Sequence, residues 1–348
     1  MASPVRHLSL VVPGLLGPVD LIEPGQLPAL QALPLLLRRS LITPSVHNTL
    51  ESQLFALFPG STVADELPVA PFSYLADSGL SSTAWCMRAD PVFMVPGQNS
   101  LMLMASGDAL QLSQAEALAI EESLNQHFRS QGVQFHAASP SRWYCFAQQQ
   151  RVETTSLRQV QGRAVQAHMP RGEDGVFWNA VLAEAQMLLY QHPVNQNRQL
   201  SGLPQINSLW LWGEGSLPGL PKSRWQQVWG REALCRGLAH VSARPQADSP
   251  QQARDWLDEA AAGEHLLVLE HLLAALPDLS QSQWTDYIVA MESVWFAPLL
   301  QALQQRQLAS LSLYPLNGHV YTLTRSRLQR WWLRPRSLIG HLQLSDYG

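Results

Sequence analysis

The side chains with the clearest potential for binding chemistry stand in two neighbouring stretches of the second half of the chain. His192, Asn195 and Arg198 follow a nearly uncharged segment, and Asn207 comes directly before the run Ser208–Trp212. These hydrogen-bonding groups lie at the ends of predicted elements, which is where the ligand sites of open α/β sheets usually form. The asparagines are equally expected to make turns, because their side chains hydrogen-bond to nearby backbone. The sequence leaves a ligand site and plain turns as two open interpretations.

A glycine-rich turn follows this run. The order Gly213-Glu214-Gly215 after a predicted strand is the usual position of a phosphate-binding loop. The next glycine, Gly219, is one residue late for G-x-G-x-x-G, and Pro218 stands where a helix would begin. We therefore expect a plain strand-to-loop turn. Together the two stretches contain six candidate ligand-binding residues: His192, Asn195, Arg198, Asn207, Trp212 and Glu214.

Reactive side chains elsewhere form no recognised catalytic motif. The sequence has no G-x-S-x-G around a nucleophilic serine, and its 11 histidines make no H-E-x-x-H pattern. Cys145 lies between aromatic residues in a predicted strand and is expected to be a buried thiol. Glu264 and Glu270 stand at opposite ends of another predicted strand, too far apart at about 3.3 Å per residue to share one metal ion. From the residues alone we expect neither a metal nor a cofactor.

The composition excludes further activities. Of the 348 residues, 46% are hydrophobic and only 14% are charged, compared with roughly 25% charged residues in ordinary soluble domains. Lys222 is the only lysine, and the residues before it lack the glycines of a P-loop, so nucleotide hydrolysis of that type is excluded. A Schiff base would depend on Lys222 alone. Three scattered cysteines indicate a reducing compartment rather than a disulfide framework.

The beginning of the chain has some features of a signal peptide. Pro13 interrupts the apolar run within Arg6–Gly17, however, and no small-residue cleavage site follows. We predict a buried first strand there. No later stretch has the roughly 18 to 20 continuous apolar residues needed to cross a bilayer. The expected location is the cytoplasm, without membrane association.

The overall charge argues against nucleic acid as a partner, because the formal net charge is −4 and binding requires many phosphates to be neutralised. The C-terminal part of the chain is the exception. Arginines near Trp331-Trp332 could contact phosphates and stack on bases. We favour an amphipathic helix that places the tryptophans in the core. The arginines concerned are Arg325, Arg327, Arg330, Arg334 and Arg336.

The order of predicted elements indicates an α/β protein with two parts. Two strands around a turn at 96–99, a helix that begins at the Ser113–Glu116 capping box, and two more strands make a β-β-α-β-β unit. Elsewhere strands alternate with helices, which is typical of a mostly parallel, helix-covered sheet. We predict an α/β core domain of residues 1–80 and 151–348 and an inserted small α+β subdomain of residues 81–150.

Several motifs in order resemble one bacterial family, the regulatory proteins of RpfE type, which are often named phosphoglycerate mutase. The resemblance covers most of the chain, from about Pro71 to Arg336. More distantly, the inserted unit and the strand-loop after Asn207 are similar to archaeal-type cofactor-independent phosphoglycerate mutases of the alkaline phosphatase superfamily. The motifs are Arg88-Ala-Asp-Pro-Val92, Ser141-Arg-Trp-Tyr144, Gln186–Asn195, Ile206–Gly215 and Trp295-Phe-Ala-Pro-Leu299.

The distant resemblance implies a doubly wound, mostly parallel sheet and a site with two divalent metals, Asp and His ligands and a Ser or Thr nucleophile. The expected ligands are missing from the matching positions. Pro13-Gly14 follows the first strand where an Asp is needed, and the first Asp is Asp20. Leu272–Pro277 contains neither Asp nor His, and His319 stands alone after the last strand. Thr43 and Ser45 match the place of the nucleophile, but a hydroxyl needs an activating partner.

Three hypotheses follow. The first is a catalytically degenerate protein of this superfamily with a regulatory role, which binds a protein or a small phosphorylated ligand near the six candidate residues. The second is an active phosphomutase or phosphatase that binds two divalent metals such as Mn²⁺ at a rebuilt site of Glu270, His271 and His319. The third is a nucleic-acid-binding regulator that uses the C-terminal arginines.

Overall fold

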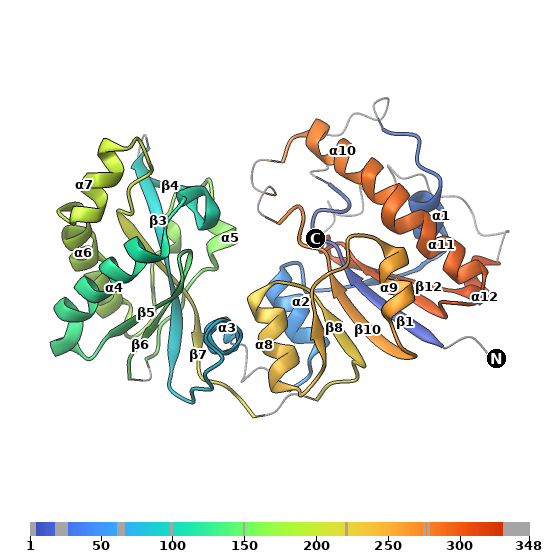
Figure 1. The fold of residues 1–348 in the computed structure, drawn as a ribbon, viewed down its shortest axis with the longest axis horizontal. Helices are drawn as coiled ribbons and strands as arrows, with labels where there is room; N and C mark the ends of the chain where they lie inside the picture. The colour runs from blue at the N-terminus through green and yellow to red at the C-terminus, as the bar shows by residue number, and fades with distance from the viewer. Residues whose placement is uncertain are drawn as a thin grey trace. The chain divides into compact units, whose positions relative to one another are not determined.

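The computed structural model describes residues 5–17, 27–60, 67–97, 100–148, 150–219, 222–273, 276 and 279–329. The chain divides into two compact units. Unit 1 is formed by Met1–Pro59 together with Pro221–Gly348, and unit 2 is the continuous stretch Gly60–Leu220 (Figure 1). No helix among the described residues is both long and apolar enough to span a membrane.

Unit 1 is built on a sheet in which seven strands are described, in the order β2-β12-β11-β1-β10-β8-β9. The five strands from β11 to β9 are parallel, and β12 and β2 complete one edge in antiparallel pairing. The predicted parallel sheet is therefore present, with an antiparallel edge. The strands are Arg6–Val11 (β1), Leu41–Pro44 (β2), Gln227–Trp229 (β8), Gln246–Ala247 (β9), Gly263–Val268 (β10), Ser310–Tyr314 (β11) and His319–Thr324 (β12).

Helices cover both faces of this sheet (Figure 1). The apolar sides of α1, α9, α10 and α11 pack on the face that includes Leu8 and Leu10 of β1, while α2 and α8 lie on the opposite face. Alternate residues of a strand point to opposite faces, so the near-continuous apolar strands are buried on both sides. The helices are Ala32–Arg39 (α1), Leu50–Leu57 (α2), Ala233–Val241 (α8), Ala253–Glu259 (α9), Gln281–Met291 (α10), Ala297–Gln304 (α11) and Arg325–Leu328 (α12).

One long-range contact fixes the start of α1, which has no local side-chain cap. The carboxylate of Glu292 accepts hydrogen bonds from the backbone N–H groups of Gln31, Ala32 and Leu33. Glu292 opens a π-helical turn, Glu292–Phe296, between α10 and α11. This negative side chain replaces a local cap because the first N–H groups of a helix have no partner within the helix.

Unit 2 contains an antiparallel sheet of five described strands. The strands run in the order β4-β3-β6-β5, and β7 also pairs with β3. They are Cys86–Pro96 (β3), Leu101–Ser106 (β4), Gln134–Ser139 (β5), Arg142–Phe146 (β6) and Ser208–Gly215 (β7). The long helices Gln114–Phe128 (α4) and Gly175–Tyr190 (α6) share one apolar core with the sheet, and Val69–Ser78 (α3) packs on the opposite face. Leu157–Val160 (α5) and Pro193–Leu200 (α7) are shorter.

The division into units differs from the predicted insertion at 81–150. The predicted β-β-α-β-β unit is present, and α4 begins at the predicted capping box of Ser113 and Glu116. The compact unit extends further in both directions, because β7 pairs with β3 over the register Cys86 to Val92 and α6 packs into the same core as α4. The strand 208–215 consequently belongs to the antiparallel sheet rather than to the parallel core.

Candidate functional site

The structure uses the first predicted site residue, His192, as a helix cap. Its side chain precedes α7, where Nδ1 accepts a hydrogen bond from Val194 N at 3.3 Å. The other ring nitrogen, Nε2, lies 3.0 Å from the hydroxyl of Ser123 on α4. Burial lowers the pKa of His192, so the neutral ring is favoured at the junction of α7 and α4.

The two predicted asparagines act as backbone tethers. Asn195 is buried, donates through Nδ2 to the carbonyls of Leu189 and Ile206 at 2.8 and 2.7 Å, and accepts from Ile206 N at 2.8 Å. Asn207 pairs with both backbone groups of Met94, at 2.8 and 2.7 Å. Each amide thus replaces a missing backbone partner where a chain segment leaves regular structure. The turn interpretation accounts for the contacts of both side chains.

The buried side chain of Arg198 links helix α7 to a loop and to helix α4. Its guanidinium donates to the carbonyl of Pro204 at 2.8 Å and to Glu116 Oε1 at 3.0 Å, and it also contacts the carbonyl of Leu110. The side chain is 1% exposed. Its donors therefore hold α7 to the start of α4, and the predicted ligand-binding role has no support in this geometry.

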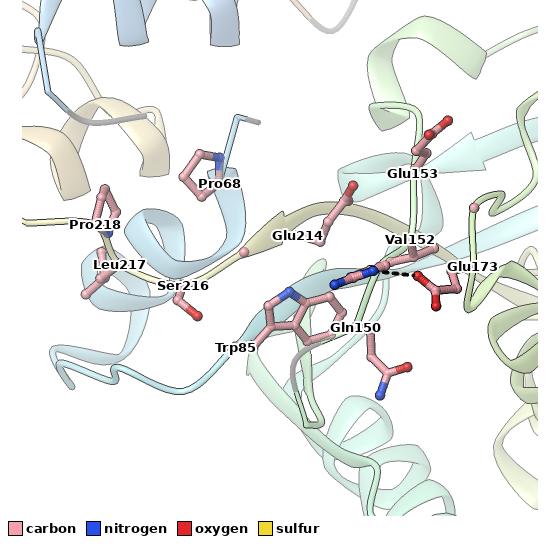
Figure 2. A pocket seen from close by; sticks show the side chains of 13 residues that line it. Pro68, Trp85, Gln150, Val152, Glu153, Glu173, Glu214, Ser216, Leu217 and Pro218 are labelled. Atoms are coloured by element: carbon pink, nitrogen blue, oxygen red, sulfur yellow. Dashed lines mark hydrogen bonds and ion pairs between the residues drawn. The ribbon is translucent and has the colours of Figure 1, made fainter. Parts of the chain in front are cut away.

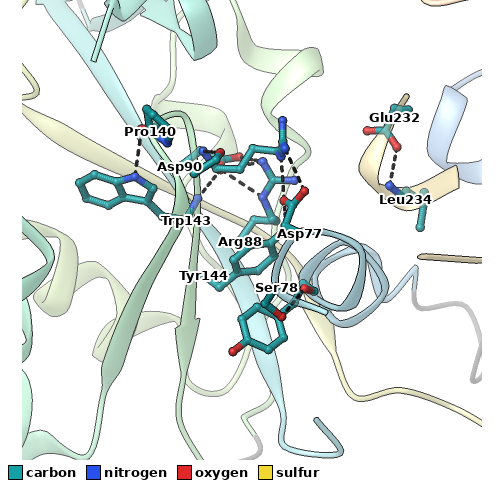
Figure 3. Close-up of polar contacts among 12 residues, drawn as sticks. Asp77, Ser78, Arg88, Asp90, Pro140, Trp143, Tyr144, Glu232 and Leu234 are labelled. Carbon is teal, nitrogen blue, oxygen red and sulfur yellow. Dashed lines mark hydrogen bonds and ion pairs between the residues drawn. The ribbon is translucent and has the colours of Figure 1, made fainter. Parts of the chain in front are cut away.

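Trp212 leads to a buried charged network that was not included among the predicted site residues. Figure 3 shows its members Arg88, Asp90 and Tyr144. The indole N–H of Trp212 donates to Asp90 Oδ2 at 2.8 Å. Asp90 is fully buried and receives two donors of the Arg88 guanidinium, with Nη2 at 2.7 Å and Nε at 3.1 Å from Oδ1. The guanidinium carbon lies 5.2 Å from the Trp212 ring centre and 5.3 Å from that of Tyr144, within cation–π range.

A second carboxylate joins this network to α3. Asp77 on α3 accepts from the Tyr144 hydroxyl at 2.7 Å and from two nitrogens of Arg142 at 2.7 and 2.8 Å (Figure 3). Tyr144 has a pKa raised by burial, which keeps the phenol protonated as a donor. All of these residues lie on the α3 face of the sheet, so the network attaches α3 to the strands.

The sequence carried a signal for this network. Arg88 and Asp90 are two residues apart in a strand, as are Arg142 and Tyr144, and such pairs point to the same face of a sheet. Both pairs lie within motifs that carry the family resemblance. What the sequence did not supply was the pairing of β3 with β6 and β7, which brings the four side chains and Trp212 together.

Glu214 lines a pocket at the end of β7 (Figure 2), and His192 lines a separate hollow between α4 and α6. The pocket at Glu214 measures about 590 Å³ and lies where the end of β7 meets the beginning of β3. Trp85 and Val152 contribute buried apolar surface, and Glu214 accepts a hydrogen bond from the hydroxyl of Thr154. The remaining lining residues come from four segments of the chain: Pro68, Gln150, Arg151, Glu153, Gly172, Glu173, Gly215, Ser216, Leu217 and Pro218.

Charge around this pocket is mainly negative. Three carboxylates, Glu153, Glu173 and Glu214, line it together with the guanidinium of Arg151. Arg151 Nη1 lies 3.0 Å from Glu173 Oε2, and both side chains are largely exposed. Gly215 allows the close approach of the backbone to Pro68, because a Cβ there would lie 2.7 Å from the proline Cβ. The pocket therefore favours neutral or cationic groups and disfavours a phosphate dianion.

In unit 1, the carboxyl end of β1 is occupied by apolar side chains. Val12, Leu15 and Leu16 follow the strand and are buried. A Cβ at Gly14, which has φ +76°, would collide with Cδ2 of Leu276. In open α/β sheets the carboxyl edge usually holds the ligand site; here the part of that edge at β1 forms part of the hydrophobic core of unit 1.

The predicted alternative metal ligands are spread over other local contacts. Glu270 Oε1 accepts from the backbone N–H groups of Arg231 and Glu232, both at 2.7 Å. The ring of His271 lies 6.5 Å from that of Tyr287, and His319 Nδ1 lies 3.3 Å from the carbonyl of Asn317. Within the described ranges no three His, Cys, Asp or Glu side chains are placed to hold a metal ion. These residues do not fit a two-metal site.

Other predicted residues fall partly outside the described ranges. Asp20, Arg330, Arg334, Arg336 and Trp331-Trp332 lie there. Arg325 and Arg327 belong to α12, and Arg327 donates to the carbonyls of Arg39 and Ser40. Ser45 is close to the turn at Gly318, to whose carbonyl its N–H donates at 2.8 Å. Cys145 is buried as predicted, and burial raises its pKa.

Comparison with known proteins identifies distant relatives. The 2,3-bisphosphoglycerate-independent phosphoglycerate mutase of Methanothrix thermoacetophila is 31% identical over 125 residues, which cover 34% of this chain and 31% of that protein. The enzyme of the same name from Methanosarcina acetivorans is 26% identical over 186 residues, covering 50% of this chain and 46% of that protein. The chain thus matches less than half the length of these relatives. A scan against protein families gives no match.

Among solved structures, the PH0037 protein of Pyrococcus horikoshii superposes with a TM-score of 0.52 at 13% identity, covering 93% of this chain and 88% of that chain. This similarity concerns the fold. The sequence matches show that the chain is distantly homologous to the cofactor-independent phosphoglycerate mutases of the alkaline phosphatase superfamily. The predicted distant resemblance is confirmed at this level, while the finer RpfE-type assignment stays a prediction.

Proposed function

We propose that this protein is a non-catalytic member of the phosphoglycerate mutase-like group, with a regulatory role exercised through binding. The observation that carries the proposal is the apolar filling at the carboxyl end of β1. Leu272 and Leu276 lie against Gly14, and Leu15 and Leu16 are buried beside them. A polar metal site at this edge would require these leucines to move and carboxylates to replace them.

The pocket at Glu214 is the proposed place for a small ligand. It combines the Trp85 wall with hydrogen-bonding groups on three loops, which is the usual composition of a small-molecule site. Its excess of carboxylates supports a neutral or cationic ligand rather than the phosphorylated ligand expected from the sequence. Glu214 and Ser216 would orient such a ligand against the indole.

The purified protein tests the catalytic part of this proposal. We expect no tightly bound transition metal by elemental analysis after purification without chelators. With added Mn²⁺ we expect no turnover of 3-phosphoglycerate or p-nitrophenyl phosphate above a heat-inactivated control. Two bound ions per chain together with turnover would overturn the proposal.

A second candidate function is the metal-dependent phosphomutase activity named for the relatives. The homology itself favours it, and the assay above distinguishes the two. If turnover were found, replacing Glu270, His271 and His319 one at a time would test the rebuilt site. A catalytic role for Glu270 predicts loss of turnover in Glu270→Gln with the unfolding midpoint unchanged, whereas its contacts with Arg231 and Glu232 predict loss of stability.

A further inference from the structure

Helix α6 is apolar on its outward face as well as on its inward face. The inward residues Trp178, Val181, Leu182, Ala185 and Leu189 are buried in the core of unit 2. On the opposite side Val176 is 84%, Met187 is 66% and Tyr190 is 82% exposed. Ala180 and Ala183 are exposed between them. A helix that is apolar all round is normally covered on both sides.

The outward residues follow the spacing of a helix–helix seam. Val176, Ala180, Ala183, Met187 and Tyr190 recur at intervals of four, three, four and three residues. This alternation keeps one stripe in line along the helix and is the spacing of the a and d positions of a coiled coil. We name these five residues the α6 stripe. Its spacing matches a partner helix that lies almost parallel or antiparallel to α6.

The α6 stripe is complementary to itself in the antiparallel direction. If a two-fold axis passes beside Ala183, Ala183 faces its own copy, Ala180 faces Met187, and Val176 faces Tyr190. Small side chains lie at the centre, where the helices can approach closely, and the long Met187 side chain meets an alanine. A parallel pair would instead place Met187 on Met187 and Tyr190 on Tyr190. Self-complementarity about a two-fold axis is the property of an isologous dimer interface.

We propose that the α6 stripe binds the α6 stripe of a second copy of this chain, antiparallel and with Ala183 on the two-fold axis. The occupant is a second copy because the stripe has small alanines near its centre and longer side chains towards its ends, an order that complements itself in an antiparallel pair. Charge agrees with it, since Glu184 is the only charged residue of α6. Glu184 already accepts from His127 at 2.8 Å and Gln131 at 3.0 Å on the same chain.

The surface on both sides of the stripe enlarges the interface. A helix of 16 residues is about 24 Å long, so the stripe alone falls below the roughly 800 Å² per partner of a standard interface. One hollow of about 330 Å³ includes Ala183 and Gln186 in its lining, and another of about 390 Å³ includes Met187 and Gln191. The partner's Met187, which faces Ala180, would enter the first hollow, and its Val176, which faces Tyr190, would lie against the second.

The first experiment measures the mass of the full chain by light scattering after gel filtration, over a range of concentrations. We expect a dimer for the unaltered protein and a monomer for Ala183→Glu, because two carboxylates would meet at the axis. The matched control is Val289→Glu, a half-exposed apolar position on helix α10 of unit 1, which would stay dimeric. An unaltered protein that is monomeric at all concentrations, or an Ala183→Glu variant that remains dimeric, overturns the proposal.

A charge-swap mixture tests the position of the axis. Ala183→Glu and Ala183→Lys are each expected to be monomeric, while their equimolar mixture forms a heterodimer in which opposite charges face each other. Failure of the mixture to dimerise, when both variants show the circular dichroism of the unaltered protein, would contradict an axis at Ala183.

Disulfide trapping tests the direction. Ala183→Cys is expected to cross-link to its own copy under mild oxidation. Val176→Cys alone is not, because the two copies of residue 176 would be about 21 Å apart along the helices; mixed with Tyr190→Cys it is expected to cross-link. The natural cysteines Cys86, Cys145 and Cys235 are buried and give little background. Cross-linking of Val176→Cys to itself would indicate a parallel pair and overturn the antiparallel arrangement.

Discussion

The carboxyl end of β1 in unit 1 and the α3 face of the sheet in unit 2 contrast in where charge is buried. The first position usually holds polar ligand-binding groups, and it is packed with leucines. The second is the interior of an antiparallel sheet, where apolar residues are usual, and it holds Arg88 and Asp90. Every charge in the second region has a partner, so a high density of charged groups there stabilises the fold rather than indicating reactivity.

The same contrast separates the network from the pocket at Glu214. Arg88 and Asp90 are almost fully buried and paired, whereas Arg151 and Glu173 form a pair that is 82% and 67% exposed. A ligand reaches only the second pair. Substitutions that move charge into or out of these regions therefore test which region is structural and which is accessible.

The largest effect is expected from Asp90→Asn. The amide keeps one acceptor oxygen, for either the Trp212 indole or the Trp143 N–H, and it removes the charge that faces Arg88. An uncompensated buried charge costs roughly 3 to 5 kcal/mol. We expect the free energy of unfolding of unit 2 to fall by about that amount, measured by urea titration with tryptophan fluorescence.

Two controls accompany this change. Glu173→Gln breaks an exposed pair of the same type, and its expected cost is below about 1 kcal/mol. Arg88→Met in the Asp90→Asn background removes the second charge and is expected to restore more than half of the lost stability. Equal costs for Asp90→Asn and Glu173→Gln would show that the buried network is not the structural region inferred above.

The next effect concerns the apolar edge in unit 1. Gly14→Ala introduces a Cβ against Leu276 at a residue with φ +76°, so conformational strain of about 1 kcal/mol adds to an overpacking cost of about 1 to 3 kcal/mol. Gly79→Ala is the matched control, because Gly79 has φ +70° and nothing within 4 Å of its Cβ position. The difference between the two unfolding free energies reports the packing at the edge, and no difference would mean that the edge is open.

The sequence predicted the elements of both regions better than their partners. The capping box at Ser113 and the parallel strands of unit 1 are local patterns, and the structure contains them. The strand 208–215 was expected in the core domain but pairs with β3, because a strand carries no local mark of the strand with which it pairs. The pairing of β3 with β7 decided whether Asn207 and Trp212 belong to a ligand site or to a core.

The candidate site shows the same limit. Asn195 and Asn207 make the turn contacts that their residue type favours, and the sequence left that interpretation open. Glu214 lines a pocket, but the loop residues opposite it, Arg151 and Glu173, are about 40 to 60 positions away and have no shared motif. A pocket between loops depends on tertiary placement that residue spacing does not encode.

A smaller effect on stability is expected for Glu116→Gln. The Glu116 carboxylate is partly exposed, between the buried Asp90 and the exposed Glu173. Burial raises the pKa of Glu116, but hydrogen bonds from Ser113 and from Arg198 outweigh it, and the pKa is lowered overall. The carboxylate therefore contributes stability that is complete above its ordinary value of 4.5 and is lost as the pH falls through the lower folded value. We expect Glu116→Gln to cost about 1 kcal/mol at pH 7.

That cost is expected to shrink towards zero as the pH falls from 6 to 3, because the protonated Glu116 of the unaltered protein then resembles the amide. Urea titrations of both proteins across this range measure it. Glu121→Gln is a useful control on the same helix, where the carboxylate accepts from Ala137 N. A cost of Glu116→Gln that is independent of pH would mean that the charge itself contributes nothing.

The smallest effect compares one buried histidine in each unit, His192 in unit 2 and His265 in unit 1. Burial lowers the pKa of both rings. At a pH below the ordinary histidine pKa of about 6.5, the unfolded chain gains a proton that the folded chain does not. The free energy of unfolding therefore falls with pH until the folded pKa is reached and then levels off.

In His192→Gln we expect the unfolding transition of unit 2 to lose this pH dependence between pH 7 and 5. The unfolding transition of unit 1 keeps it, because His265 still accepts from Trp229 Nε1 at 3.3 Å. Urea titrations at the two pH values measure both, and an equal change in the two transitions would show that the histidines do not act within their own units.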